Sequence, residues 1–177
     1  MVSLSKKVCL IGDFAVGKTS LVRRFVHDLF DDRYLSTIGV KVSRKTVVVD
    51  HSQDVIEITM MLWDLAASEE LTTMRASYLR GAAGVLLVAD LTRPATWEHL
   101  PTYKADIDAI SPGAPCVLAA NKVDLLPGND AGCATLAAVQ AVADALAAPL
   151  CLTSALTGDQ VEDAFRHLAH MMAGGSP

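Results

Sequence analysis

The stretch GDFAVGKTS, residues 12–20, combines residue types that can bind phosphate. It fits the pattern G-x-x-x-x-G-K-[ST], follows an apolar run and opens a helical pattern, which is the context that this motif requires. The glycines let backbone N–H groups close around phosphates, the lysine ammonium reaches phosphate oxygens, and the threonine hydroxyl can bind Mg²⁺. We therefore predict a phosphate loop rather than a plain glycine-rich turn, with contacts from Gly12, Ala15, Val16, Gly17, Lys18, Thr19 and Ser20.

A second motif, NKVD at residues 121–124, indicates the base of a nucleotide. It directly follows the apolar run PCVLAA, at the end of an expected strand, where open α/β sheets bind ligands. A carboxylate accepts two hydrogen bonds at once, and guanine offers adjacent N1–H and N2–H donors that adenine lacks. Asp124 therefore favours guanine. The alternative is a surface turn whose aspartate caps a helix, but the upstream phosphate loop favours base binding.

The elements expected to hold these motifs alternate between strands and helices. Apolar runs rich in Val, Ile and Leu predict buried strands at 8–11, 85–89, 117–120 and 150–153. Helical patterns occur at 18–27, 95–110 with a kink or break at Pro101, 134–147 and 161–172. Such alternation is typical of a mainly parallel sheet with helices on both faces. Two β-rich runs, 41–50 and 54–64, predict a hairpin that adds an antiparallel edge strand.

Length and composition limit the class of protein. The chain has 177 residues, 51% of them hydrophobic, and a formal net charge of -5. We expect one α/β domain over residues 1–173 with a flexible tail at 174–177, and no nucleic acid as a primary ligand. The first residues resemble neither a signal peptide nor a membrane span. The chain has four cysteines without CxxC spacing: Cys9, Cys116, Cys133 and Cys151. All but Cys133 lie in apolar runs, so we expect them to be core residues. A reduced, cytoplasmic compartment follows from this expectation.

The order and spacing of the motifs resemble the small GTPases of the Ras superfamily, and among them the Rab branch most. Besides GDFAVGKTS and NKVD, the matching segments are YLSTIGV (34–40), WDLA (63–66), YLRGAAGVLLVADLT (78–92) and TSALTGDQVEDAF (153–165). The resemblance covers nearly the whole chain. It implies a Ras-like P-loop NTPase fold with a six-stranded sheet, and a molecular switch that binds GTP or GDP with Mg²⁺.

The resemblance also implies roles for individual residues near the phosphates. Phe30 would stack on the guanine, Tyr34 would close over the phosphates, and Thr37 would bind Mg²⁺ and sense the γ-phosphate. Asp64 would hold Mg²⁺ through water. Plainer alternatives are core packing for Phe30, a hairpin-edge hydroxyl for Thr37 and a turn residue for Asp64.

The guanine pocket implied by the resemblance combines the NKVD motif at residues 121–124, called the base loop below, with the segment after the last expected strand. Leu156 stands where the family commonly has lysine, and it would cover the purine face as an apolar group. The other implied pocket residues are Asn121, Lys122, Asp124, Ser154 and the backbone N–H of Ala155.

Three positions near the γ-phosphate depart from the family pattern. Ser68 replaces the glutamine that orients the attacking water, a role that a short hydroxyl cannot copy. Ala67 replaces a glycine that contacts the γ-phosphate and lets the switch pivot. Phe14 is bulky, and it would project toward the γ-phosphate and the space for an arginine finger. We therefore expect weak GTP hydrolysis, with Lys18, Thr37 and Ser68 as the catalytic group.

Other interpretations of these departures stay open. Glu69 or Glu70 could position the water instead. A non-hydrolysing, GTP-dependent scaffold or pseudo-GTPase fits the same substitutions. A P-loop kinase or ATPase is disfavoured by Asp124 and by the lack of an evident lid insertion between Val85 and Asn121.

Effector or regulator proteins are the expected partners, because family members change their contacts as the γ-phosphate comes and goes. The matching surface would be the segment that begins at Ser36 and ends at Val42, together with Trp63 and Tyr78. Core packing is an equal alternative for the two aromatic residues. No cysteine follows Cys151, so the prenyl anchor usual in the Rab branch is not expected in this chain.

Overall fold

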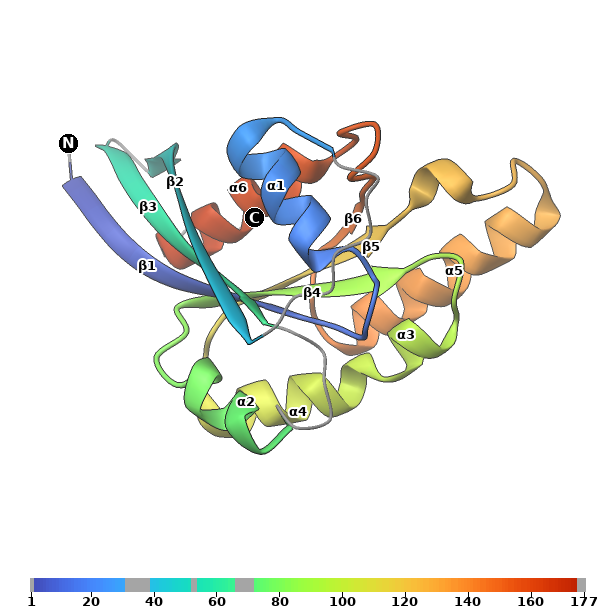
Figure 1. The fold of residues 1–177 in the computed structure, drawn as a ribbon, viewed down its shortest axis with the longest axis horizontal. Coiled ribbons are helices and arrows are strands. Elements are labelled where there is room, and N and C mark those ends of the chain that lie inside the picture. Colours follow the sequence, from blue (N-terminus) through green and yellow to red (C-terminus); the bar gives the residue numbers. More distant parts are fainter. Residues whose placement is uncertain (1, 31–38, 52–53, 66–71, 175–177) are drawn as a thin grey trace.

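The structure is a computed structural model that describes residues 2–30, 39–51, 54–65 and 72–174 (Figure 1). Its strands are β1 (Val2–Ile11), β2 (Val40–His51), β3 (Asp54–Leu65), β4 (Gly84–Asp90), β5 (Cys116–Asn121) and β6 (Leu150–Leu152). Its helices are α1 (Lys18–His27), α2 (Thr72–Leu79), α3 (Ala95–Glu98), α4 (Leu100–Ile110), α5 (Asp130–Ala145) and α6 (Val161–Met172), with a 3₁₀ turn η2 at Val123–Leu125. Within these ranges no helix is both long and apolar enough to cross a membrane.

The described strands form one six-stranded sheet in the order β2-β3-β1-β4-β5-β6. β1 pairs in parallel with β3 and β4, and β5 pairs in parallel with β4 and β6. β2 runs antiparallel to β3 and lies at one edge of the sheet. The predicted fold class, a mainly parallel sheet with an antiparallel edge strand, is confirmed.

Helices cover both faces of this sheet, with α1 and α6 on one face and α2 to α5 on the other (Figure 1). Alternate residues of β1 pack into the apolar clusters on the two faces of the sheet. Val8 and Leu10 join the apolar cluster that includes α1 and α6, whereas Cys9 and Ile11 join the cluster on the opposite face. Successive strand residues point to opposite faces, so a strand covered on both sides needs an apolar residue at nearly every position.

Two predicted helices differ in their bounds. The helix expected over 95–110 is divided at His99 into α3 and α4, slightly before the expected break. Pro101 lies in the first turn of α4, where a missing N–H costs no intrahelical hydrogen bond. α5 begins four residues earlier than predicted, because the Asn129 side chain accepts hydrogen bonds from the N–H groups of Ala131 and Gly132.

Other elements are longer than their apolar patterns, or lack such a pattern. β1 starts at Val2 rather than at residue 8, because its outer half pairs only with β3 and tolerates exposed polar residues such as Ser3 and Ser5. α2 was not predicted, since TTMRASYL has few apolar residues from which to recognise a helix.

The cysteines have the core role predicted for three of them. Cys9, Cys116 and Cys151 are buried, Cys133 is exposed, and all four are free thiols. Burial raises the pKa of each buried thiol to about 11. These thiols therefore stay protonated at neutral pH and act as small apolar residues.

Candidate functional site

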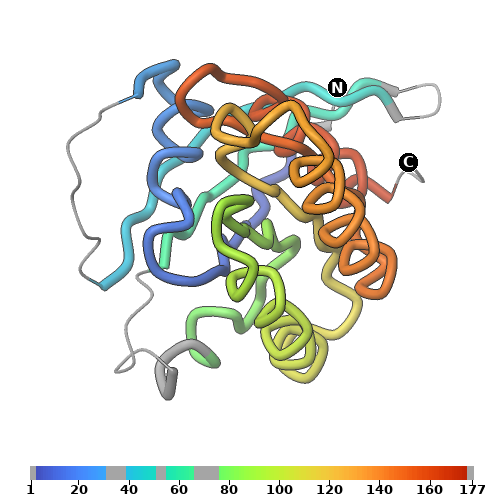
Figure 2. Tube along the Cα trace, turned by 90° about the vertical axis from the view of Figure 1, so that its right-hand side faces the viewer, coloured from blue at the N-terminus to red at the C-terminus, as the bar shows by residue number. Residues whose placement is uncertain are grey.

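The candidate site lies at the carboxyl ends of β1, β4 and β5, which are neighbours in the sheet. The loop after β1 runs beside the turn that follows β4 and contacts Asn121, the last residue of β5 (Figure 2). Parallel strands bring their carboxyl ends to one edge, so residues far apart in the sequence meet there.

Close approach shapes the phosphate loop at two glycines. A Cβ atom on Gly12 would lie 2.2 Å from the carbonyl oxygen of Val88, and one on Gly17 would lie 2.2 Å from Asn121 Nδ2. Gly17 also has a φ of +104°, in the left-handed region that favours glycine. A larger residue at either position would push the loop away from the strand ends.

Lys18 is held inside the curve of this loop. Its Nζ donates to the carbonyl oxygens of Gly12 at 2.7 Å and Asp13 at 2.8 Å, and the residue is only 7% exposed. α1 begins at Lys18 without a side-chain cap. An anion in the loop would therefore meet a fixed ammonium and the positive end of a helix, which is the arrangement expected for phosphate.

Thr19 and Asp64 meet next to the phosphate loop. Thr19 Oγ1 donates to Asp64 Oδ2 at 2.5 Å, and Asp64 is 1% exposed. Its second oxygen, Oδ1, is buried and has no hydrogen-bond partner among the described residues. Burial raises the pKa of the Asp64 carboxyl, and the hydrogen bond from Thr19 and the charge of Lys18 offset this only in part. The contacts made by the described residues thus stabilise the Asp64 charge only in part, and Oδ1 is left without a hydrogen bond.

Magnesium fits this pair of side chains. Hydroxyl and carboxylate oxygens are the protein ligands that Mg²⁺ prefers, and Asp64 Oδ1 needs a partner such as a metal-bound water. No group of three His, Cys, Asp or Glu side chains within the described ranges could hold a metal ion. Mg²⁺ at nucleotide sites commonly takes one or two protein oxygens and completes its shell with phosphates and water.

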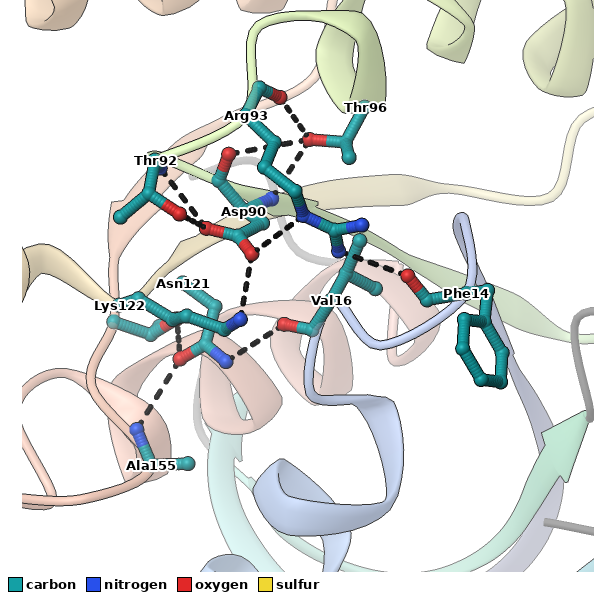
Figure 3. Close-up of polar contacts among 10 residues, drawn as sticks. Phe14, Val16, Asp90, Thr92, Arg93, Thr96, Asn121, Lys122 and Ala155 are labelled. Carbon is teal, nitrogen blue, oxygen red and sulfur yellow. Dashed lines mark hydrogen bonds and ion pairs between the residues drawn. The ribbon is translucent and has the colours of Figure 1, made fainter. Parts of the chain in front are cut away.

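Asn121 connects three loops of the site (Figure 3). Its side chain is buried; Nδ2 donates to the Val16 carbonyl at 2.9 Å, and Oδ1 accepts from the Ala155 N–H at 3.2 Å and from Thr153 Oγ1 at 3.4 Å. The structure therefore brings together the predicted phosphate loop, base loop and Ala155 segment. Lys122 follows with a φ of 68°, a left-handed conformation that begins the turn of the base loop.

Asp124 is exposed and is oriented by a hydrogen bond from Ser154. Ser154 Oγ donates to Asp124 Oδ1 at 2.5 Å, and the buried Ser154 accepts a hydrogen bond from the Thr157 N–H. An exposed carboxylate fixed in this way can accept hydrogen bonds from a ligand. The alternative of Asp124 as a helix cap receives no support, since η2 has no side-chain cap bond.

Arg24 was not recognised from the sequence, yet it contacts two residues that are predicted to line the base pocket. Its Nε donates to the Ala155 carbonyl at 3.0 Å and its Nη2 to the Leu156 carbonyl at 2.6 Å. Its Nη1 binds Asp28, two residues before Phe30. Phe30 is 39% exposed and Leu156 51%, so core packing does not explain Phe30.

Asp90, at the end of β4, is a second residue that the sequence reasoning missed. It accepts hydrogen bonds from Lys122 Nζ at 2.6 Å, Arg93 Nε at 2.9 Å and the N–H and hydroxyl of Thr92. Burial opposes ionisation of Asp90 most strongly, but these donors together outweigh it and lower the pKa of the carboxyl. Its place at the end of the apolar run GVLLVAD was the signal that could have found it.

Asp13 attaches the phosphate loop to the junction of α3 and α4. Its Oδ2 lies 2.7 Å from His99 Nδ1, and its Oδ1 accepts a hydrogen bond from the Tyr103 hydroxyl at 2.5 Å. Nothing in the local motif indicated these contacts, because His99 and Tyr103 come from a distant part of the chain.

Trp63 and Tyr78 of the predicted partner surface lie side by side. Their ring centroids are 6.3 Å apart with an interplanar angle of 49°, and Lys7 Nζ lies 4.1 Å from the centroid of the Trp63 ring. Both aromatic residues are partly buried against the core, whereas Val42 is 46% exposed. Core packing thus accounts for part of each aromatic side chain, and the partner role stays a prediction.

Several predicted site residues lie outside the described residues. They are Tyr34, Ser36, Thr37, Ala67, Ser68, Glu69 and Glu70. Their predicted roles at the γ-phosphate, at Mg²⁺ and in partner binding therefore stay predictions.

Comparison with known proteins agrees with this geometry. The Ras family model matches residues 7–173. The chain is 40% identical to Ras-related protein Rab-32A of Dictyostelium discoideum over 131 residues, 71% of this chain and 58% of that relative. It is 35% identical to Ras-related protein RABD1 of Arabidopsis thaliana over 164 residues, covering 92% of the chain and 77% of the relative.

A third relative, Ras-related protein Rab-1C of Dictyostelium discoideum, is 32% identical over 172 residues, 97% of this chain and 82% of the relative. The chain thus spans less than two thirds of the Rab-32A protein but about four fifths of the other two. The chain belongs to the Ras family of small GTPases, in the Rab branch.

Proposed function

We propose that this chain binds GTP and GDP with Mg²⁺ and hydrolyses GTP slowly, as a nucleotide-dependent switch. The observation that carries the proposal is the contact of Thr19 with the buried Asp64 beside the phosphate loop, with Asp64 Oδ1 lacking a partner among the described residues. We also propose that residues 1–173 form the nucleotide-binding domain. The four free cysteines support a cytoplasmic location.

The phosphate end of the site has a defined task in this proposal. The loop N–H groups and Lys18 hold the β- and γ-phosphates and balance their charge. Bound Mg²⁺ would neutralise negative charge that develops on the phosphate oxygens during transfer. Thr19 would hold it directly, Asp64 through water, and Thr37 would complete the protein ligands.

The base end selects guanine in this proposal. Asp124 accepts hydrogen bonds from the guanine N1–H and N2–H groups, and the contact from Ser154 supports this orientation. Phe30 and Leu156 provide exposed apolar surface for the purine. Competition against a fluorescent mant-GDP complex tests base choice: GDP should displace the probe and ADP should not. Equal displacement by ADP would contradict guanine selection.

The proposal of slow GTP hydrolysis is based on the residue types at positions 68, 67 and 14, which are Ser68, Ala67 and Phe14. Phe14 is 54% exposed, which supports a position at the open side of the phosphate loop. In single-turnover measurements on GTP-loaded protein, we expect hydrolysis well below the roughly 3–5 × 10⁻⁴ s⁻¹ of glutamine-bearing Ras. A rate equal to that of Ras contradicts weak hydrolysis, and complete retention of GTP would favour the pseudo-GTPase.

Restoring the family residues should accelerate hydrolysis. We expect the triple variant Ser68→Gln, Ala67→Gly and Phe14→Gly to cleave GTP at least about tenfold faster, because a glutamine can orient the attacking water. The matched control replaces Ser68→Gln with Ser68→Asn, whose amide is one methylene shorter and should give little gain. If the glutamine variant is no faster than wild type, these substitutions do not limit the rate.

We also propose that effector or regulator proteins read the nucleotide state through residues 36–42 with Trp63 and Tyr78. The contact between the two aromatic rings supports a shared surface. Pull-down with GDP-loaded and GTP-loaded protein, comparing wild type with Val42→Asp, tests it. Equal partner capture by the GDP-loaded and GTP-loaded forms, and by wild type and Val42→Asp, would contradict the proposal.

A further inference from the structure

The guanidinium of Arg93 links the phosphate loop to the base loop (Figure 3). Its Nη2 donates to the carbonyl oxygen of Phe14 at 2.8 Å, and its Nε donates to Asp90 Oδ2 at 2.9 Å. The same Asp90 oxygen accepts a hydrogen bond from Lys122 Nζ at 2.6 Å. A continuous chain of three polar contacts thus runs from Phe14 to Lys122.

Asp90 is a rigid support for this chain of contacts. Its side chain is 1% exposed, and its other oxygen accepts hydrogen bonds from Thr92 N–H at 2.9 Å and Thr92 Oγ1 at 2.6 Å. The following turn is fixed as well, because Thr96 Oγ1 accepts from the Asp90 N–H and donates to the Arg93 carbonyl. The backbone that carries Arg93 is therefore held at both ends of the turn.

We propose that Arg93 is a positioning residue that holds the phosphate loop against the base loop and thereby slows release of the nucleotide. The inference rests on the proposed nucleotide binding, and it adds a residue that touches neither base nor phosphate in that proposal. In the proposed function one nucleotide is held by the phosphate loop and the base loop at once, so a contact that adds to the Asn121–Val16 link between them would oppose its release. The Phe14 ring points away from Arg93, so the link uses the backbone of the loop and not its unusual side chain (Figure 3).

The geometry requires an arginine at this position. The two contacts use different nitrogen atoms of one planar guanidinium, whereas a lysine has a single nitrogen. Arg93→Lys can keep an ion pair with Asp90, but it cannot also reach the Phe14 carbonyl in the same geometry. The lysine variant therefore separates the effect of the bridge from the effect of the charge.

Arg166 provides a matched control away from the site. Its Nε donates to Glu162 at 2.9 Å and its Nη1 to the Val48 carbonyl at 3.0 Å, so it also joins a carboxylate to a distant backbone carbonyl. The side-chain exposure is 45% for Arg166 and 43% for Arg93. Loss of Arg166 should therefore affect stability to a similar degree without affecting the nucleotide.

The test measures dissociation of mant-GDP in the presence of Mg²⁺ and excess GDP, for wild type, Arg93→Met, Arg93→Lys, Arg166→Met and Arg166→Lys. We expect both Arg93 variants to release mant-GDP about tenfold faster, since each loses the bridging hydrogen bond. Both Arg166 variants should stay within twofold of wild type. Urea unfolding of each variant measures the accompanying change in stability.

Each contrary result has a distinct meaning. Wild-type protein that fails to bind mant-GDP overturns the proposed function and this inference with it. If wild type binds the probe and the Arg93 variants release it at the wild-type rate, only the inference is overturned. Wild-type release by Arg93→Lys together with faster release by Arg93→Met would show that the charge suffices, which overturns the role of the bridge. Equal acceleration by the Arg166 variants would attribute the effect to general loosening, which also overturns the role of Arg93.

Discussion

At the scale of single residues, the buried carboxylate of Asp90 allows two positively charged side chains of the site to lie close together. Arg93 and Lys122 both bind Asp90 Oδ2, and their mutual repulsion is offset by its negative charge. The low pKa of Asp90 means that this charge persists throughout the neutral range. Asp90 is thus an electrostatic centre between the phosphate loop and the base loop.

The stability conferred by Asp90 should depend on pH in a defined direction. Because its pKa in the folded protein lies below the ordinary 3.8, its contribution is present above that pH and is lost as the pH falls through the folded-state value. We expect Asp90→Asn to lower the free energy of unfolding by about 2 kcal/mol at pH 7, since both cationic partners are partly exposed. The difference from wild type should shrink toward pH 3. Urea unfolding of nucleotide-free protein measures it, and a difference that is constant with pH contradicts the assignment.

At the scale of elements, the sequence was informative where a local pattern determines the structure. The apolar run of β4 and the glycine-lysine motif before α1 each depend on adjacent residues, so both could be predicted. The division of α3 from α4 at His99 and the polar outer half of β1 depend on neighbours in the folded protein. Patterns of hydrophobicity cannot report those neighbours.

The same distinction applies to the candidate site. Lys18 and Asn121 lie in recognisable motifs, and the structure places them together. The contacts of Lys122 with Asp90, Arg93 with Phe14 and Tyr103 with Asp13 join residues 32, 79 and 90 positions apart. No single motif contains both members of such a pair, so the framework behind the motif residues could not be predicted.

Arg24 connects helix α1 with the segment after β6, and its loss should weaken nucleotide binding. Arg24→Met removes hydrogen bonds to the Ala155 and Leu156 carbonyls, and we expect the Kd for mant-GDP to rise by roughly five- to tenfold. Arg24→Met also removes the i,i+4 ion pair of Arg24 with Asp28. Lys104→Met is the control, because it removes the i,i+4 ion pair of Lys104 with Asp108 on α4. Equal Kd values for Arg24→Met and wild type in a fluorescence titration would exclude this role.

At the scale of the whole molecule, two helices on one face of the sheet form a single support for the site. The rings of Phe25 in α1 and Phe165 in α6 stack with centroids 4.1 Å apart and an interplanar angle of 8°. α1 begins at Lys18, within the phosphate loop motif. The packing of α1 on α6 and the sheet therefore fixes the position of that end of the loop. Helix α1 therefore contributes both to the core, through Phe25, and to the predicted phosphate site, through Lys18.

Two phenylalanines should separate stability from binding. Phe165 is fully buried, and we expect Phe165→Ala to lower the free energy of unfolding by about 3–5 kcal/mol because it leaves a cavity. Phe30 is 39% exposed, so Phe30→Ala should cost less than about 1 kcal/mol of stability but weaken mant-GDP binding. Urea unfolding and fluorescence titration of both variants test this contrast. Equal losses of stability would mean that Phe30 belongs to the core.

The contact between Lys7 and Trp63 has a consequence for spectroscopy. Trp63 is partly buried, has the Lys7 ammonium 4.1 Å from its ring centroid, and directly precedes Asp64 in β3. The other tryptophan, Trp97, is 5% exposed in α3. We therefore expect the fluorescence of Trp63, next to the proposed magnesium site, to change on nucleotide exchange in unlabelled protein, with the shielded Trp97 as a nearly constant background.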